Sequence, residues 1–255
     1  MRLIDSHVHV DGLEELDFST ERARKAGVTG IIAVGMDGSS NRRTLEIAER
    51  YPGFVYPALG LHPRALAGLG EEEVTAELKF IQENISRIVA VGEIGLDYDK
   101  RVVQTTPKPW QQRILCRLLE LAKQYNKPVS VHALYAWKDT FDLVKQSGVR
   151  QAVFHWYAGL TNVLDSILQA GYLISATPAA EYHKEHRRAI RHMPLENLLL
   201  ETDAPVFYGR GPKYRSEPAD ILRSLRAVSA IKGVTEETVA EQTTKNACKF
   251  FGLDK

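Results

Sequence analysis

Two histidines near the start of the chain have the spacing of metal ligands on a β-strand. His7 and His9 flank Val8 at the end of an apolar run, and the two-residue period of a strand puts both imidazoles on one face. Imidazole nitrogens are good ligands for divalent transition metals. A single HxH pair also arises by coincidence or as a hydrogen-bonded pair, so its meaning depends on the rest of the chain.

Further histidines and carboxylates stand at the ends of other apolar runs. Glu93 closes IVAVGE, His132 closes PVSVH and His155 closes QAVFH. Asp203 follows the run NLLLET. A buried ionisable group is costly unless it is paired or bound to a metal. Each residue alone has a plain explanation as a hydrogen-bonded histidine or an ion-paired acid, but together with the HxH pair they predict a shared metal centre.

The size of this set favours two metal ions. Four imidazoles and two carboxylates exceed the three or four protein ligands of a single zinc site. The expected division is a first ion on His7, His9 and Asp203, a second ion on His132 and His155, and a bridge at Glu93. A water molecule between two cations loses a proton near neutral pH and attacks an electrophile that the metals polarise. Asp203 then either ligates only or also accepts that proton as a general base.

The elements that must position these side chains alternate regularly. The predicted strands are residues 2–6, 28–34, 54–59, 88–93, 128–132, 151–155, 171–176 and 197–202. Apolar residues recur at helical spacing in 71–85, 110–125, 137–147, 161–170, 183–192, 217–231 and 235–251. This alternation predicts an α/β protein, a (β/α)8 TIM barrel with residues 1–255 as a single domain. The alternative, a doubly wound open sheet, normally has fewer strands and a glycine-rich first turn, which DSHVH is not.

In a barrel the candidate ligands converge, because the carboxyl ends of all strands open onto one mouth. Two long loops, 94–109 and 203–217, are expected at the same mouth. The stretch 203–217 is rich in glycine, proline and basic residues. Loops at this end build the active sites of barrel enzymes.

Composition excludes several classes of protein. With 255 residues, 44% hydrophobic and 25% charged, the chain is too apolar for intrinsic disorder and lacks the apolar run of a transmembrane helix. Charges interrupt the N-terminal stretch where a signal peptide would be apolar. Cys116 and Cys248 form no CxxC pair, which is typical of a reducing compartment. We therefore expect a cytoplasmic protein with no membrane partner.

The net charge of +1 conceals an asymmetry along the chain. Residues 1–100 carry 11 basic and 17 acidic side chains, whereas residues 101–255 carry 22 basic and 15 acidic ones. An anionic substrate is expected to meet the second half of the chain, unless the asymmetry is only scattered surface charge. The near-neutral total excludes a strongly basic nucleic-acid coat.

Seven segments, in order along the chain, resemble the TatD-type deoxyribonucleases of the amidohydrolase superfamily. They are DSHVH near the start, GLHP at 60–63, VGEIGLDY at 91–98, VHA at 131–133, FHWYAG at 154–159, LETDAP at 200–205 and RSEP at 215–218. The resemblance implies a (β/α)8 barrel whose two metals, magnesium or another divalent ion, serve DNA hydrolysis. It implies the same six ligands and adds His62 as a substrate-contacting or acid/base residue, with a turn cap as the alternative.

Ligand type and resemblance point to different metals. Four histidines favour zinc, manganese or cobalt, whereas the resemblance allows magnesium. Two divalent ions are therefore expected, with zinc, manganese and magnesium as the candidates.

Three positions depart from the family pattern. Arg64 stands where a second histidine commonly follows GxHP, Leu134 stands where an arginine commonly follows the fifth-strand histidine, and RSEP replaces RNEP. These changes alter positions that face the substrate rather than the metal ligands. The cations expected to contact phosphate are Arg64, Arg210, Lys213 and Arg215, unless they are solvated loop charges.

The sequence thus predicts a divalent-metal-dependent hydrolase, a phosphodiesterase or deoxyribonuclease in which a metal-activated water cleaves DNA. The catalytic residues would be Asp203, Glu93 and His62. A barrel mouth admits single strands or frayed ends better than a stacked duplex. The alternatives are a metal-dependent hydrolase of a small ester, lactone, amide or phosphotriester, and a non-catalytic module that uses the barrel as a scaffold.

Overall fold

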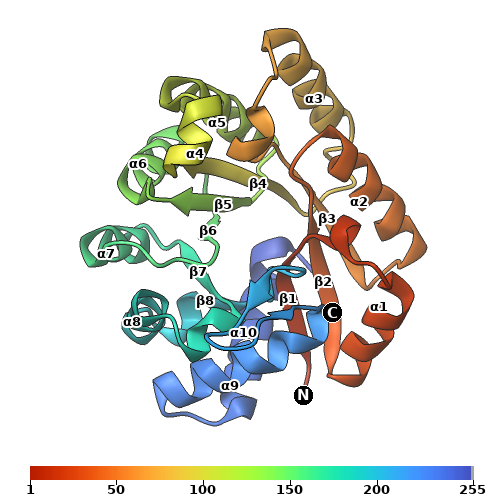
Figure 1. Cartoon of the computed structure of the whole chain (residues 1–255), viewed down its shortest axis with the longest axis vertical. Helices are drawn as coiled ribbons and strands as arrows, with labels where there is room; N and C mark the ends of the chain where they lie inside the picture. Colours follow the sequence, from red (N-terminus) through yellow and green to blue (C-terminus); the bar gives the residue numbers. More distant parts are fainter. Residues whose placement is uncertain (254–255) are drawn as a thin grey trace.

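The computed structural model describes residues 1–253. They contain a sheet of eight parallel strands whose spatial order equals their chain order (Figure 1). The strands are β1 (Leu3–Val8), β2 (Val28–Val34), β3 (Val55–Leu59), β4 (Ala90–Asp97), β5 (Val129–Leu134), β6 (Ala152–Phe154), β7 (Leu173–Ala176) and β8 (Leu198–Leu200). All eight overlap the predicted strands, so the (β/α)8 barrel is confirmed.

Helices surround the strands on the outside of the barrel (Figure 1). They are α1 (Leu16–Lys25), α2 (Gly38–Arg50), α3 (Glu71–Glu83), α4 (Lys100–Thr105), α5 (Lys108–Gln124), α6 (Trp137–Ser147), α7 (Thr161–Gln169), α8 (Lys184–His192), α9 (Ile221–Lys232) and α10 (Glu236–Phe251). The seven predicted helical stretches are confirmed as α3 and α5 to α10. Helix α1 was not predicted from an apolar period, because it buries only Ser19, Thr20 and Ala23.

Backbone hydrogen bonds beyond the end of β8 close the barrel against β1. The amide of Asp203 donates to the carbonyl of His7 at 3.0 Å, and the amide of His9 donates to the carbonyl of Ala204 at 2.8 Å. The packed interior that results holds mainly Val, Ile, Leu and Ala side chains from the strands. The closing bonds bring the first and the last predicted ligands together at one seam.

A buried carboxyl reinforces the same seam. Asp5, within β1, accepts hydrogen bonds from the amide of Thr202 at 2.9 Å and from its hydroxyl at 2.6 Å. Burial raises the pKa of Asp5 well above its usual range, although the bonds from Thr202 oppose this. Asp5 therefore joins the first and last strands below the metal ligands.

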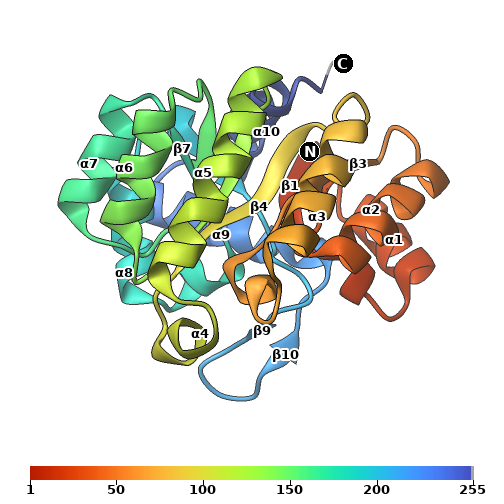
Figure 2. The same ribbon diagram turned by 90° about the horizontal axis from the view of Figure 1, so that it is seen from above.

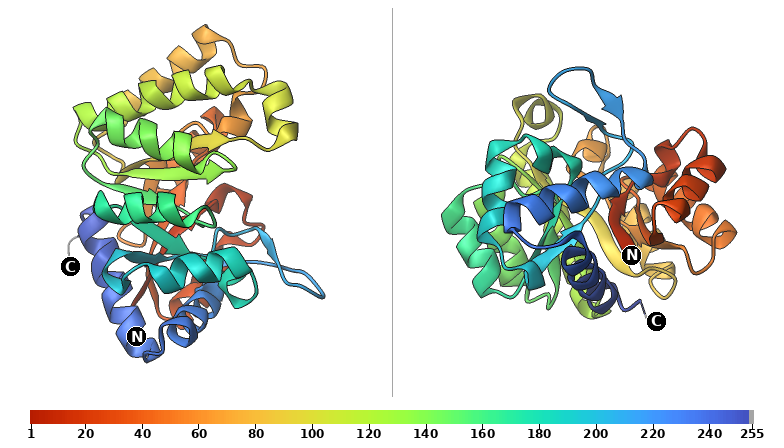
Figure 3. Two further views of the ribbon diagram at one scale, coloured as in Figure 1. Left: turned by 90° about the vertical axis from the view of Figure 1, so that its left-hand side faces the viewer. Right: turned by 90° about the horizontal axis from the view of Figure 1, so that it is seen from below.

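The two expected mouth loops contain regular structure. Strand β4 continues past its predicted end at Glu93 to Asp97, because buried Ile94 and Leu96 extend its apolar pattern through Gly95. Residues after β8 form a hairpin of β9 (Phe207–Tyr208) and β10 (Tyr214–Arg215). In Figure 2 this hairpin and α4 lie at one end of the barrel and both termini lie at the other, and Figure 3 shows the hairpin projecting. The prediction that Glu93 ends a strand is thus wrong: it lies in the middle of one.

Membrane-spanning segments were searched for over residues 1–253. None of the helices there combines the length and the apolar character needed to cross a bilayer. Helix α5, at 17 residues, is the longest and has charged residues throughout.

One buried histidine outside the mouth is held in its neutral form. The amide of Thr177 donates to Nε2 of His186 at 3.1 Å, and Nδ1 of His186 donates to the carbonyl of Tyr157 at 2.8 Å. A proton on Nε2 would face the N–H of Thr177, so this pair of bonds fits only the neutral ring. Burial lowers the pKa of His186 to about 4.

We expect this histidine to make the fold sensitive to mild acid. Below its ordinary pKa of 6.5 the unfolded chain binds a proton that folded His186 takes up only near pH 4. Its contribution to stability is therefore complete above pH 6.5 and declines by about 2 kcal/mol between pH 7 and pH 5. Urea unfolding of the wild type and of His186→Gln at both pH values isolates this contribution. An equal pH-dependent loss in both proteins would contradict the assignment.

Candidate metal centre

The predicted ligands converge on the carboxylate of Glu93 at the mouth of the barrel. Oε2 of Glu93 lies 3.4 Å from Nε2 of His7 and 3.6 Å from Nε2 of His9. Oε1 of Glu93 lies 3.0 Å from Nδ1 of His132 and 2.7 Å from Nε2 of His155. The two oxygens of one buried carboxylate thus face two different pairs of histidines, which is the division expected of a bridging ligand.

The first group of predicted ligands lies at the seam between β1 and the segment after β8. Oδ1 of Asp203 stands 3.7 Å from Nε2 of His7 and 3.3 Å from Nε2 of His9. Ligand atoms of these three residues all lie within 4.8 Å of one another, close enough to hold one ion. Asp203 has a left-handed backbone, with φ of 50°. Such strain in a residue other than glycine is typical of functional sites.

The second group includes His62 from the loop after β3. Nε2 of His62 lies 3.6 Å from Oε1 of Glu93, and His62, Glu93 and His132 offer ligand atoms within 4.8 Å of one another. Nδ1 of His62 accepts a hydrogen bond from the amide of Arg64 at 3.1 Å, which caps the short 3-10 turn Pro63–Leu66. The structure thus shows the turn cap at Nδ1, whereas the role of His62 in substrate contact or acid/base chemistry stays a prediction.

Two buried acids that the sequence analysis did not single out stand behind the histidines. Oε1 of Glu201 lies 3.5 Å from Nδ1 of His155, and Oδ2 of Asp97 lies 3.5 Å from Nε2 of His132. Both acids are almost fully buried. A carboxylate behind a ligating imidazole fixes its orientation and raises its basicity. The only signal in the sequence was the acid in each of the segments LETDAP and GEIGLDY.

The site's charges shift one another's pKa values in complementary directions. Burial disfavours the protonated form of His155, but Glu93 and Glu201 outweigh burial and raise its pKa well above the usual range. Burial likewise opposes protonation of His9, yet Asp203 and Glu93 raise its pKa to about 9. Burial favours neutral Glu93, but the surrounding histidines lower its pKa well below the usual range. The field that attracts protons here attracts metal cations equally.

Orphaned polar atoms show that the residues fit a metal ion. Nε2 of His7 and Oδ1 of Asp203 are buried and have no hydrogen-bond partner within residues 1–253. Buried polar atoms without a partner are rare in folded proteins. These two atoms lie 3.7 Å apart. A cation between them would satisfy both, as the choice of imidazole and carboxylate donors also favours.

A cavity of about 730 Å³ opens above this cluster. Among its lining residues are His9, His62, Arg64, Leu134 and Trp156. Nε of Arg64 donates to Oδ2 of Asp97 at 2.8 Å, which holds the guanidinium at the cavity wall. Two of the three departures from the family pattern, Arg64 and Leu134, thus line the space that a substrate would occupy.

The other predicted phosphate-binding cations lie elsewhere. Arg215 donates to the carboxylate of Glu14 and to the carbonyl of Gly12, so its side chain is directed away from the cavity. Lys213 belongs to the turn between β9 and β10 and does not line the cavity. Arg210 lines a separate pocket next to it. The structure therefore brings only Arg64 of the four to the metal centre.

Fold and site together define a metal-dependent hydrolase built on a (β/α)8 barrel. Residues 4–252 match the family model described as TatD related DNase. The chain belongs to this family, which confirms the resemblance inferred from the sequence.

Relatives with similar sequences cover nearly the whole chain. The "Putative deoxyribonuclease tatdn3" of Danio rerio is 34% identical over 97% of this chain and 96% of its own length. The "Deoxyribonuclease TATDN3" of Homo sapiens is 33% identical over 98% and 94%, respectively. The crystal structure of YJJV, a TatD homologue from Escherichia coli, superposes with a TM-score of 0.89 at 29% identity and covers 98% of each chain.

Proposed function

We propose that this protein is a two-metal phosphodiesterase that cleaves DNA. The observation that carries the proposal is the division of the Glu93 carboxylate, whose two oxygens face different pairs of histidines. Relatives over the full length carry the name deoxyribonuclease, which supports DNA as the substrate. In this proposal the ligand sets are His7, His9 and Asp203 for one ion, His132 and His155 for the other, and Glu93 for both.

The ligand chemistry supports zinc or manganese and keeps magnesium among the ions to test. Imidazole nitrogens suit zinc and manganese better than magnesium, which prefers oxygen. When bound, such ions polarise a phosphoryl oxygen and lower the pKa of water.

Asp203 is the proposed general base. Burial tends to raise its pKa, but His9 and His7 outweigh burial and lower it, so the carboxylate is ionised at neutral pH. Asp203 is also a proposed metal ligand. A carboxylate has two oxygens, so one can bind a metal ion while the other accepts the proton.

His62 and Arg64 are the proposed substrate contacts. Burial lowers the pKa of His62 well below its usual range, and its Nδ1 accepts a hydrogen bond, so the neutral ring carries its proton on Nε2. His62 lines the cavity, with Nε2 3.6 Å from Oε1 of Glu93, and in this proposal its N–H donates to a phosphate oxygen. The Nη atoms of Arg64, beyond the bond from Nε to Asp97, supply further donors of the kind that bind phosphate.

Single-stranded DNA or a frayed end is the proposed form of the substrate. Glu93 is only 2% exposed and lies below the cavity rim, where a stacked duplex would have to open for its phosphate to reach the metal ligands. A flexible single strand can reach the same metal ligands without any base pairs being broken.

The test is hydrolysis of an end-labelled single-stranded oligonucleotide by metal-stripped protein resupplied with magnesium, manganese or zinc. We expect a ladder of shortened products that requires metal, and a rate at least about 100-fold lower in Asp203→Asn, which removes the proton acceptor. The protein with Asp11→Asn, an exposed acid near the mouth, is the matched control and should keep wild-type activity. Absence of cleavage with every metal would overturn the DNA proposal in favour of a small ester, lactone, amide or phosphotriester as substrate.

We also propose that the protein works in a reducing compartment, the cytoplasm. Cys116 and Cys248 are both free thiols, which supports this location. Fractionation of cells that express the tagged protein tests it.

A further inference from the structure

A second, cationic pocket adjoins the cavity of the metal centre. It has a volume of about 380 Å³ and is lined by Glu181, Tyr182, Lys184, Arg187, Arg191 and Arg210. His183, which lies between Tyr182 and Lys184 in the chain, lines the metal-centre cavity instead. Neighbouring residues of this short segment at the start of α8 therefore line the two hollows.

Two elements form the walls of this cationic pocket. Lys184, Arg187 and Arg191 lie at positions i, i+3 and i+7 of α8, which places them on one face of the helix. Arg210 comes from the turn of the β9–β10 hairpin, and its Nη2 donates to the carbonyl of Tyr182 at 2.5 Å. The guanidinium also stands 5.9 Å from the centre of the Tyr182 ring. These contacts hold the hairpin's cation against the basic face of α8.

The positive charge of the cationic pocket is not neutralised by neighbouring acids. Its one carboxylate, Glu181, pairs with Arg223 at 2.8 Å. Within residues 1–253, Lys184, Arg191 and Arg210 have no carboxylate within 4.0 Å of their charged nitrogens, and Arg187 donates only to backbone carbonyls. Clustered like charges at a concave surface attract anions strongly.

We propose that the cationic pocket binds a backbone phosphate of the nucleic-acid strand at a position away from the bond being cleaved. This inference rests on the proposed function, because the strand must have its scissile phosphate in the adjoining cavity. Arginine and lysine clusters are the usual partners of such phosphates, and these contacts carry no sequence preference. The consequence is that affinity depends on strand length: a strand that spans both hollows gains contacts that a small diester does not.

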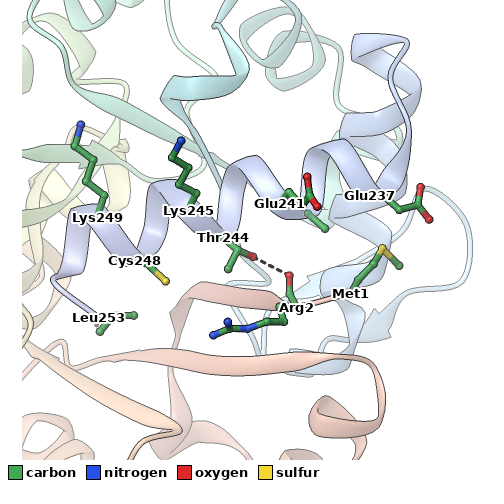
Figure 4. A pocket seen from close by; sticks show the side chains of 10 residues that line it. Met1, Arg2, Glu237, Glu241, Thr244, Lys245, Cys248, Lys249 and Leu253 are labelled. Atoms are coloured by element: carbon green, nitrogen blue, oxygen red, sulfur yellow. Dashed lines mark hydrogen bonds between the residues drawn. The ribbon is translucent and has the colours of Figure 1, made fainter. Parts of the chain in front are cut away.

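The test removes two of the four cations without touching the metal centre. Lys184 and Arg191 are exposed and donate no side-chain hydrogen bond within residues 1–253, so Lys184→Ala/Arg191→Ala should leave the fold intact. The matched control is Lys245→Ala/Lys249→Ala, which removes the same charge from exposed positions of α10. Figure 4 shows these control lysines projecting from α10 at a pocket that Met1 and Arg2 also line. Both termini lie at the end of the barrel away from the hairpin (Figure 2).

We expect kcat/KM for a 12-nucleotide single strand to fall about tenfold in Lys184→Ala/Arg191→Ala. The slope of log KM against log salt should fall by about 0.7, the contribution of one phosphate contact on a single strand. Hydrolysis of bis(p-nitrophenyl) phosphate should be unchanged, because this small diester reaches only the metal centre. The control pair should behave as the wild type on both substrates.

An equal loss on both substrates would overturn the inference, as would a single-strand rate equal to that of the control. Fluorescence anisotropy of a labelled 12-nucleotide strand, measured with metal-stripped protein, tests the cationic pocket without turnover. If the wild type hydrolyses the small diester but no DNA, the proposed function fails. The pocket assignment fails separately if Lys184→Ala/Arg191→Ala binds the strand as tightly as the wild type does.

Discussion

Glu93→Gln is expected to lower the rate of DNA cleavage at least about 1,000-fold while the barrel stays folded. Both oxygens of Glu93 face imidazoles, and an amide of the same shape replaces one of them with an NH2 group that cannot ligate a cation. The neutral amide also removes the negative charge that attracts metal into the site. One substitution therefore weakens both ligand groups at once.

Three measurements decide the result for Glu93→Gln. Single-turnover cleavage gives the rate, elemental analysis gives the metal content per chain, and thermal melting monitored by circular dichroism reports on the fold. Glu120→Gln, an exposed acid on α5, is the control and should match the wild type in all three. Wild-type turnover in the Glu93→Gln protein would refute the bridging role. Loss of metal together with a cooperative melting transition would support it.

Removal of the metal is expected to abolish turnover and to lower the melting temperature by on the order of 10 °C. A ligand present at 1,000 times its Kd stabilises the folded state by about 4 kcal/mol, and in a chain of this size each kcal/mol shifts the melting temperature by about 2–4 °C. The reason lies in the seam, where Nε2 of His7 and Oδ1 of Asp203 are buried without a hydrogen-bond partner among residues 1–253. A cation would satisfy both atoms.

This second prediction is measured by melting chelator-stripped protein against increasing zinc or manganese, with activity assayed in the same samples. The Asp203→Asn protein serves as the comparison, because it lacks one ligand of the seam group and should show a smaller shift. Identical melting temperatures and turnover before and after verified removal of the metal would rule out the proposed centre.

The sequence was sufficient to predict the eight strands and the six proposed ligands because both depend on local patterns. Each of His132, His155 and Asp203 follows an apolar run, and a barrel brings the ends of all such runs to one mouth. The end of β4 was misplaced because Gly95 interrupts an apolar pattern that the folded strand continues. Local patterns therefore locate a strand well but misplace its end where a glycine interrupts the apolar pattern.

Side-chain contacts between residues that lie far apart in the chain could not be predicted from the sequence. Glu201 and Asp97 matter because they stand behind histidines of other strands, which no spacing along the chain reveals. Arg215 was expected to contact phosphate, yet it pairs with Glu14, about 200 residues away in the chain. The cationic pocket was missed for the same reason, since its arginines belong to α8 and to the hairpin. The partners of cationic side chains in loops can be identified only once the fold is known.

The seam between β1 and the segment after β8 has a consequence for synthesis of the protein. His7 and His9 leave the ribosome early, whereas Asp203 emerges only after most of the chain, and the bond from Thr202 to Asp5 joins residues 197 positions apart. Contacts of such long range form late in folding. A nascent chain therefore lacks the first ligand group until nearly all strands have been translated. We therefore expect polypeptides that end before Asp203 to lack hydrolytic activity.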